Sequence, residues 1–335
     1  KWQRQAIWWS EFIKKLENPV RSPETLEHFL SLPKSKQDEL KDVGGYVGGT
    51  LIDGRRGARS VESRDLVTLD LDNIPSGMTE EVLKKISLLG CALLVHSTRK
   101  HEPARPRLRV IIPLASTVTA EEYEPIARKV AELIGIEWAD PTTFQASRLM
   151  YNASCSSDSV YVFKVLDGGF LDPKGVLAMY KDWHNHLEWP LVPNEAQKYT
   201  HLADKQQDPR EKGGIIGAFC RTYDIYRAMD ELIPGAYLST EHEDRYTYSG
   251  GSTAGGAIVY NGLWLYSHHA TDPVSGRLCN AWDLVRLHKF SDLDVDVKPD
   301  TPTNKLPSYS AMAEFVRGIK EVSVLLTKER YEEAS

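Results

Sequence analysis

The chain has 335 residues, of which 41% are hydrophobic and 26% charged, a composition that excludes intrinsic disorder and suffices for two or three domains. Its net charge of -6 excludes a protein that coats nucleic acid by bulk attraction, so any nucleic-acid contact is expected to be local. No apolar run reaches the roughly 18 residues that cross a membrane and no signal peptide is apparent, so we expect a soluble cytoplasmic protein.

Residues 1–64 are expected to form a small α/β module. Apolar residues recur with helical spacing in three segments, and a glycine-punctuated strand follows them. These elements are predicted at residues 3–16, 23–32, 34–41 and 44–52. Positive charge then gathers at 55–64, where four arginines stand against one glutamate.

Residues 65–170 alternate cleanly between strand and helix patterns. The predicted elements are a strand at 65–72, a helix at 79–89, strands at 91–98 and 107–114, a helix at 119–135 and a strand at 160–166. This βαββαβ order is the split βαβ, or ferredoxin-like, motif, which places its first and third strands side by side in the middle of the sheet. The predicted fold class is therefore α+β.

The two central strands of this motif are predicted to share a polar face. On the first strand, apolar residues alternate with Thr68, Asp70 and Asp72, so one face can pack on the helices while the other presents both carboxylates. On the third strand, Arg107 and Arg109 alternate with apolar residues in the same way. Two arginines are therefore expected to lie beside the two aspartates.

The pattern changes after about residue 170. Residues 171–212 are predicted to form a helix, at 173–186, and then a polar linker. Residues 213–335 are predicted to form a smaller C-terminal domain of helices and mixed α/β structure. Its expected elements are a helix at 215–232, short strands within 257–267, a helix at 280–290, a charged, Pro-containing stretch at 291–305 and a last helix from about Ser308.

The aspartate pair suggests a metal site. Two aspartates spaced i, i+2 on a strand place hard oxygen ligands on one face, about 6 to 7 Å apart at Cα, where they can bridge Mg²⁺ or Mn²⁺. Asp-X-Asp alone is a weak signal that also occurs at exposed strand ends. Here the pair falls at the centre of a sheet, where two charges are costly unless a metal ion or a cation neutralises them.

Two further segments carry candidate site residues. His101 follows the second strand in a basic loop; a loop histidine is usually a surface residue, but beside Ser97 and the strand arginines it is interpreted as a phosphate or metal-site donor. Asp140 and Arg148 follow the second helix in ADPTTFQASRLMYNAS. The simpler interpretation of Asp140 is that Asp-Pro starts a turn.

These segments together resemble a known family. TLDLDN, STRKH with RPRLRVIIPL, and ADPTTFQASRLMYNAS are similar, in order and spacing, to the three motifs of the archaeo-eukaryotic primase superfamily, in particular the primase-polymerases of phages, prophages and other mobile elements. The resemblance spans about residues 45–165. It implies an RRM-like catalytic sheet fused to an N-terminal α/β module.

The resemblance also implies roles for the candidate residues. Two divalent ions, Mg²⁺ or Mn²⁺, would be bound by Asp70, Asp72 and Asp140. The phosphates of the incoming nucleotide would be contacted by His101, with Arg109, Arg148 and Arg107 as nucleotide-binding arginines. Lys100 stands where the family often has Ser before the His, which leaves Ser97 or Thr98 as the hydroxyl partner.

The C-terminal region is similar to the segment that follows the primase core in such phage proteins and leads to a helicase-type ATPase. The chain contains no GxxxxGK[ST] motif, so a helicase would lie outside it. The four cysteines form no CxxC pair, which argues against a zinc ribbon and a disulfide framework. His268 and His269, being adjacent on a strand, are expected to point to opposite faces and, with Asp272, to be structural or DNA-contacting rather than ligands of one ion.

The predicted function is that of a DNA primase and DNA polymerase, a nucleotidyltransferase that starts and extends strands on single-stranded DNA with dNTPs or NTPs in the cytoplasm of a bacterial host. Two alternatives stay open. One is a non-catalytic replication-origin or single-strand-binding module, which carboxylates on the sheet face disfavour because they repel phosphates. The other is a metal-dependent nuclease, which the basic set after the second strand disfavours.

Overall fold

The computed structural model describes residues 2–298 and 301–334 and divides into two compact units. Unit 1 comprises the chain up to Trp183 together with Glu188–Glu195, and unit 2 comprises His184–Leu187 and the chain from Ala196 onward. The segment predicted as a helix and a linker is therefore shared between the units. It contains α6 (Pro173–Leu177), which is shorter than predicted, and α7 (Glu195–Lys205), which was predicted as polar linker.

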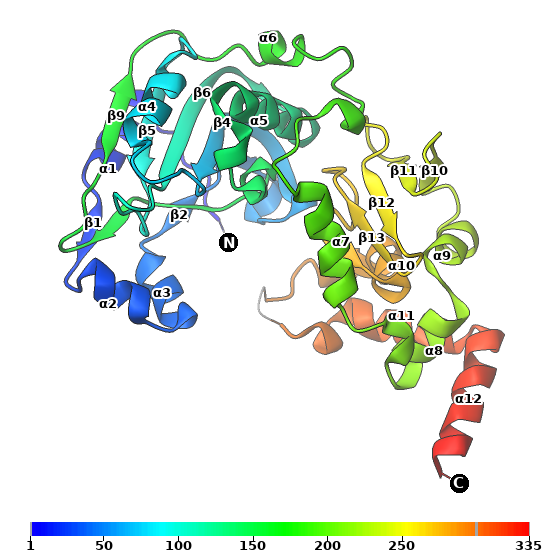
Figure 1. Ribbon diagram of the computed structural model, residues 1–335. Helices are drawn as coiled ribbons and strands as arrows, with labels where there is room; N and C mark the ends of the chain where they lie inside the picture. Colours follow the sequence, from blue (N-terminus) through cyan, green and yellow to red (C-terminus); the bar gives the residue numbers. More distant parts are fainter. Residues whose placement is uncertain (1, 299–300, 335) are drawn as a thin grey trace. The chain divides into compact units, whose positions relative to one another are not determined.

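A five-stranded antiparallel sheet with the strand order β3-β4-β6-β5-β9 forms the centre of unit 1 (Figure 1). The strands are β3 (Gly49–Leu51), β4 (Val61–Leu71), β5 (Leu93–Ser97), β6 (Leu108–Val118) and β9 (Phe163–Leu166). The predicted first and third strands, β4 and β6, are neighbours in the middle of the sheet. The α+β class and this pairing are confirmed.

Two helices, α4 (Thr79–Ser87) and α5 (Ala120–Ile134), cover one face of the sheet, with α5 against β4 (Figure 1). α5 begins at a capping box, in which Thr119 Oγ1 accepts a hydrogen bond from Glu122 N and the Glu122 carboxylate accepts one from Thr119 N. Val67, Leu69 and Leu71 of β4 are fully buried. By the period of a strand, Asp70 faces the opposite side.

The edges of this sheet differ from a ferredoxin-like sheet, in which the last strand lies beside the first. Here β9 pairs with β5 at the far edge. The chain reaches that edge because, after α5, it pairs with the N-terminal segment through β7 (Met150–Tyr151) and β8 (Ser154–Ser156). The outer side of β4 is instead covered by β3 and by a bridge between Leu71 and Ala139.

The N-terminal segment belongs to the same unit as the sheet. Its elements before β3 are α1 (Trp9–Glu17), β1 (Val20–Ser22), α2 (Leu26–Ser31), α3 (Lys34–Lys41) and β2 (Gly45–Tyr46). The single strand predicted for its glycine-rich end is split into β2 and β3, and the predicted boundary after residue 64 falls inside β4. Phe12 of α1 packs in one cluster with Leu94 and Ile111 of the sheet, so α1 covers part of the face opposite to α5.

Unit 2 combines a second antiparallel sheet with helices (Figure 1). Its strands, in sheet order, are β10 (Tyr237–Ser239), β11 (Arg245–Tyr248), β12 (Ala257–Tyr260), β13 (Trp264–Ser267) and β14 (Leu278–Cys279). Its helices after α7 are α8 (Gly214–Thr222), α9 (Ile225–Leu232), α10 (Ala281–Phe290), α11 (Pro307–Arg317) and α12 (Lys320–Ala334). A shared apolar core lies between the sheet and the helices.

Two local signals explain how the elements of unit 2 are divided. The single helix predicted at 215–232 is broken because the Asp224 carboxylate accepts a hydrogen bond from Arg227 N at 2.8 Å and starts α9 anew. Asn261 and Gly262 both have positive φ, which suits the tight hairpin turn between β12 and β13.

Within the charged stretch predicted at 291–305, residues 299–300 lie outside the described residues. In the described part of the chain, no helix combines the length and apolarity of a membrane crossing.

His269 and Asp272 of unit 2 take part in buried hydrogen bonds. His269 is fully buried, and its Nε2 accepts hydrogen bonds from Tyr248 N at 3.1 Å and Gly256 N at 3.2 Å. Asp272 is also fully buried and accepts hydrogen bonds from Tyr237 Oη at 2.8 Å and Val274 N at 3.0 Å. The structural interpretation is thus confirmed for His269 and Asp272, which have no surface to offer to DNA.

Asp272 is expected to make unit 2 less stable in acid. Burial alone would raise the pKa of Asp272, but hydrogen bonds, first from His288 and then from Val274 N, outweigh burial and lower this pKa from its ordinary value of 3.8. The resulting stabilisation is present above pH 3.8 and is lost as the pH falls through the lower native-state pKa. In urea unfolding, Asp272→Asn should cost about 1–3 kcal/mol at pH 7 and less at pH 3, whereas an equal cost at both would contradict this.

Candidate active site

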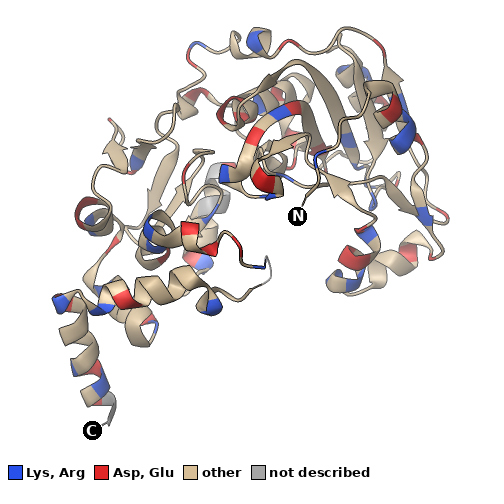
Figure 2. Ribbon diagram, turned by 180° about the vertical axis from the view of Figure 1, so that it is seen from behind, with Lys and Arg blue, Asp and Glu red and all other residues tan. Residues whose placement is uncertain are grey.

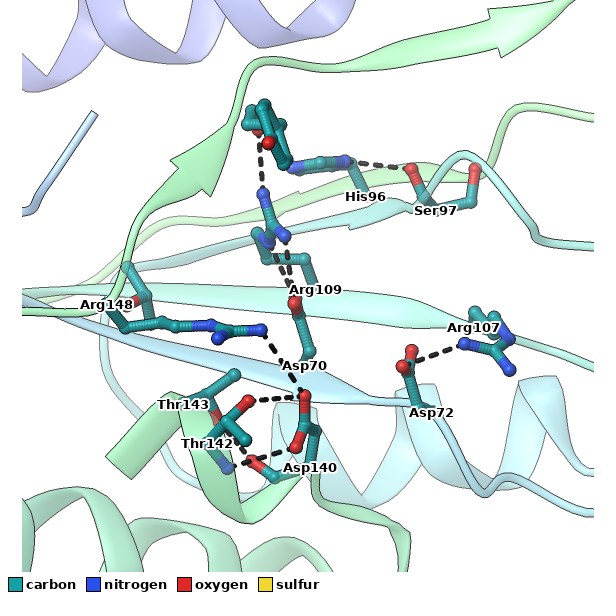
Figure 3. Close-up of polar contacts among 12 residues, drawn as sticks. Asp70, Asp72, His96, Ser97, Arg107, Arg109, Asp140, Thr142, Thr143 and Arg148 are labelled. Carbon is teal, nitrogen blue, oxygen red and sulfur yellow. Dashed lines mark hydrogen bonds and ion pairs between the residues drawn. The ribbon is translucent and has the colours of Figure 1, made fainter. Parts of the chain in front are cut away.

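A row of polar side chains crosses the face of the unit 1 sheet opposite to α5. Asp70 on β4 pairs in register with Arg109 on β6, and Arg109 pairs in register with His96 on β5. Cross-strand partners direct their side chains to the same face, so Arg109 lies between Asp70 and His96 (Figure 3). The predicted placement of Arg109 beside Asp70 is confirmed.

Arg109 binds both carboxylate oxygens of Asp70. Its Nε donates to Oδ1 at 2.6 Å and its Nη2 donates to Oδ2 at 2.9 Å, while its Nη1 donates to the Tyr151 carbonyl at 2.7 Å. Burial alone would raise the pKa of Asp70, but the charge of Arg109 outweighs it and lowers this pKa. Asp70 is therefore an ionised carboxylate whose charge is balanced.

Asp72 follows β4, two residues beyond Asp70. Arg107 Nη1 donates to its Oδ2 at 2.8 Å, and both side chains are about one-third exposed (31% and 30%). The pKa of Asp72 is raised, first by burial and next by the Asp70 carboxylate, with the Asp140 carboxylate adding to both. The attraction of Arg107 offsets these effects only in part, so the negative charge of Asp72 is less well balanced than that of Asp70.

Asp140 is brought to β4 by the main chain. Its N–H donates to the Asp70 carbonyl at 2.8 Å. Its carboxylate accepts hydrogen bonds from Thr142 N at 3.0 Å and Thr142 Oγ1 at 2.7 Å, capping the short 3₁₀ helix Pro141–Phe144. Arg148 Nη2 approaches Asp140 Oδ2 to 3.8 Å. Asp140 thus starts the turn that Asp-Pro favours and also presents its carboxylate beside Asp70 (Figure 3).

These residues line one cavity of about 350 Å³. Its walls carry three carboxylates against seven Lys and Arg side chains, although basic and acidic residues are interspersed along both units (Figure 2). The predicted site residues that line it are Asp70, Asp72, Ser97, Arg107, Arg109, Asp140 and Arg148. The sequence prediction of a local basic site in an acidic protein therefore matches the observed distribution of charge.

His101 does not line this cavity, in contrast to its predicted position at the phosphates. Its side chain is buried, with 3% exposed, and its Nδ1 accepts a hydrogen bond from Arg107 N at 3.1 Å. Burial lowers the pKa of His101, which keeps the ring neutral at neutral pH. The structure therefore gives His101 the role of holding the main chain of Arg107, because the loop folds its ring inward.

Five further charged or titratable side chains, which were not predicted as site residues, also line the cavity. They are Lys41, Arg56, His96, Arg99 and Lys100. Burial and, next, the nearby Lys41 lower the pKa of Lys100, so cations crowd this wall. The basic stretches in the sequence could have indicated the arginines and Lys100. No local pattern distinguishes His96 from a core residue, because its role follows from the strand register.

The site contains side chains of the type that binds divalent cations. Carboxylate oxygens are the ligands that Mg²⁺ and Mn²⁺ prefer. The pKa of Asp72 is raised first by burial and next by the carboxylate of Asp70. Among the described residues, however, no group of three or more His, Cys, Asp or Glu side chains is arranged to hold a metal ion. At Asp70 the reason is Arg109, which engages both oxygens.

The fold and the site define an α+β protein with a basic, carboxylate-bearing cavity on its first sheet. The chain belongs to the VapE N-terminal domain family, whose model matches residues 1–192. Among solved structures, the AEP domain of the primase-polymerase of cyanophage S-2L is similar, with 17% identity over 44% of this chain and 76% of that chain and a TM-score of 0.31. No curated protein matches the chain.

Proposed function

We propose that unit 1 is the catalytic domain of a primase-polymerase, which transfers nucleotides to a 3′ hydroxyl or to an initiating nucleotide on single-stranded DNA and releases pyrophosphate. One observation carries the proposal: Asp70, Asp72 and Asp140 line the same cavity as seven Lys and Arg side chains. The carboxylates serve the reacting centre, and the surplus of positive charge serves a polyanionic substrate such as a nucleoside triphosphate. We also propose that the sheet of unit 1 is RRM-like.

The basic residues would grip the triphosphate. Arg107 and Arg148 each reach a carboxylate of the site and are partly exposed, so their remaining N–H groups can donate to phosphate oxygens. Lys100 adds a third cation on the same wall, and Ser97 lies at the end of β5 beside it. His101 would act indirectly by fixing the main chain of Arg107.

Asp72 and Asp140 would hold divalent cations, with Asp70 as the third carboxylate. Such ions would activate the attacking hydroxyl and neutralise charge on the leaving pyrophosphate. The protein's own contribution is to position the carboxylates along one strand end and to neutralise negative charge with Arg107 and Arg109. Unit 2 would keep the template strand or the initiating nucleotide in place. The same proposal includes a helicase beyond this chain and a location in the cytoplasm of a bacterium.

A second candidate is a non-catalytic module that binds nucleotides or single-stranded DNA. The observation that favours it is the bidentate pairing of Asp70 with Arg109, which balances the central carboxylate without a metal ion. A paired carboxylate repels phosphates less than a bare one, so the repulsion that disfavours a nucleic-acid-binding module is weaker here.

One assay separates the candidates. The chain is incubated with a single-stranded template, labelled dNTPs or NTPs, and Mg²⁺ or Mn²⁺, beside the double variant Asp70→Ala, Asp72→Ala. Incorporation by the wild type alone supports the polymerase. DNA binding that needs no metal and gives no incorporation points to the binding module, and shortening of the template points to a nuclease.

A further inference from the structure

Arg109 lies between two hydrogen-bond acceptors on the sheet face. Asp70 is its register partner on one neighbouring strand, and His96 is its register partner on the other (Figure 3). Neighbouring strands are about 4.8 Å apart, so a long guanidinium side chain on the middle strand can reach either neighbour. Of these two acceptors it contacts Asp70, through Nε and Nη2.

The imidazole of His96 has an acceptor that none of the described residues uses. Its Nδ1 lies 2.9 Å from the Ser97 carbonyl, which can only accept, so Nδ1 carries the proton. Nε2 is then a bare lone pair, and it is buried and has no hydrogen-bond partner among the described residues. Burial, with Arg109 next in effect, lowers the pKa of His96 to about 4, so the ring stays neutral at neutral pH. A buried acceptor left unpaired costs free energy and needs an explanation.

Metal binding at Asp70 would compete with Arg109. A divalent cation at this carboxylate, which the proposed function requires and on which this inference rests, would take up the oxygens that the guanidinium now holds. It would also repel the guanidinium, because both are cations a few ångströms apart. The Nη1 contact to the Tyr151 carbonyl does not involve Asp70 and can persist while the other two nitrogens turn away.

We propose that Arg109 is a placeholder cation, which leaves Asp70 when a divalent ion binds there and then donates a hydrogen bond to His96 Nε2. His96 is thus a positioning residue for Arg109. This gives the unpaired His96 Nε2 a function and explains why the Asp70–Arg109 pair occupies the centre of the proposed metal site. It also links metal binding to phosphate binding, because Arg109 leaves Asp70 only when the ion is present and is then free to face phosphates.

A double-mutant cycle on metal affinity tests the proposal on the full chain without nucleotide. Free Mn²⁺ is measured by electron paramagnetic resonance for the wild type, Arg109→Gln, His96→Asn and the double variant. Arg109→Gln removes the competitor and should tighten Mn²⁺ binding by about tenfold or more. His96→Asn keeps a donor for the Ser97 carbonyl but lacks the distal acceptor, and it should weaken binding about three- to tenfold. In the Arg109→Gln background it should have no effect.

A second readout observes His96 directly. In protein with ¹⁵N-labelled histidine, the Nε2 resonance that disappears in His96→Asn should shift when Mg²⁺ is added to the wild type and should not shift in Arg109→Gln. Thermal unfolding confirms that each variant is folded. If the wild type binds Mn²⁺ but the two substitutions act additively, the placeholder role is wrong and the proposed function stands. If the wild type binds no divalent ion, both fall.

Discussion

Replacing Asp72 with Asn is expected to lower nucleotide incorporation by about a thousandfold, the loss typical when an enzyme loses a group that stabilises charge in the transition state. Asn has the size of Asp but no charge, so the fold should persist. Asp72 is the sharpest single choice because burial, Asp70 and Asp140 raise its pKa, whereas Arg109 lowers the pKa of Asp70, so the negative charge of Asp72 is less well balanced than that of Asp70. The rate is measured by primer extension at saturating Mg²⁺.

The matched control is Asp65→Asn, the same substitution on β4, the strand that leads into Asp72. Asp65 is exposed and does not line the cavity, so incorporation should stay within about twofold of the wild type. If Asp72→Asn kept a tenth or more of the wild-type rate, Asp72 would not serve the reacting centre, and the non-catalytic module would become the better description of unit 1.

Replacing Arg128 with Met is expected to destabilise unit 1 by about 3–5 kcal/mol, the cost typical of breaking a buried ion pair by removing one partner. Arg128 is 2% exposed and donates to Glu124 at 2.9 Å and to both carboxylate oxygens of Glu195 at 3.0 and 2.7 Å. The substitution keeps most of the side-chain volume and removes the cation that balances two buried carboxylates. Urea unfolding followed by circular dichroism measures the loss.

Two companion variants identify the cause. Lys36→Met breaks the Lys36–Glu39 pair, whose side chains are 64% and 68% exposed, and should leave the free energy of unfolding almost unchanged because water screens the pair. Adding Glu124→Leu and Glu195→Met to Arg128→Met removes the stranded charges and should recover most of the stability. If the triple variant were no more stable than Arg128→Met, lost packing against the Phe144 ring, 4.6 Å from the guanidinium, would be the cause instead.

The central part of the site could be predicted because strand periodicity and topology carry it. Alternation on β4 and β6 places Asp70 and Arg109 on one face, and the split βαβ order makes these strands neighbours. The observed register then pairs the two residues directly. Helix boundaries were also readable where a capping signal marks them, as at Thr119, which begins α5.

The rest depended on long-range packing. The position of β9 beside β5 follows from pairing between the N-terminal segment and residues 150–156, which no local pattern encodes. The positions of two histidines could not be predicted for the same reason. His101 stands in the basic loop but turns inward to Arg107 N, whereas His96, which looks like a core residue, lines the cavity because of its register with Arg109.

The backbone hydrogen bond from Asp140 N to the Asp70 carbonyl limits how such sequences can vary in length. Ala139 bridges Leu71 and the Asn73 N–H donates to the Trp138 carbonyl, so residues 138–140 run beside the end of β4 in fixed register. Gaining or losing one residue between α5 and Asp140 would shift this pairing by one step and turn the carboxylate to the other side of the backbone. The stretch from Gly135 to Asp140 should therefore keep a constant length among such sequences.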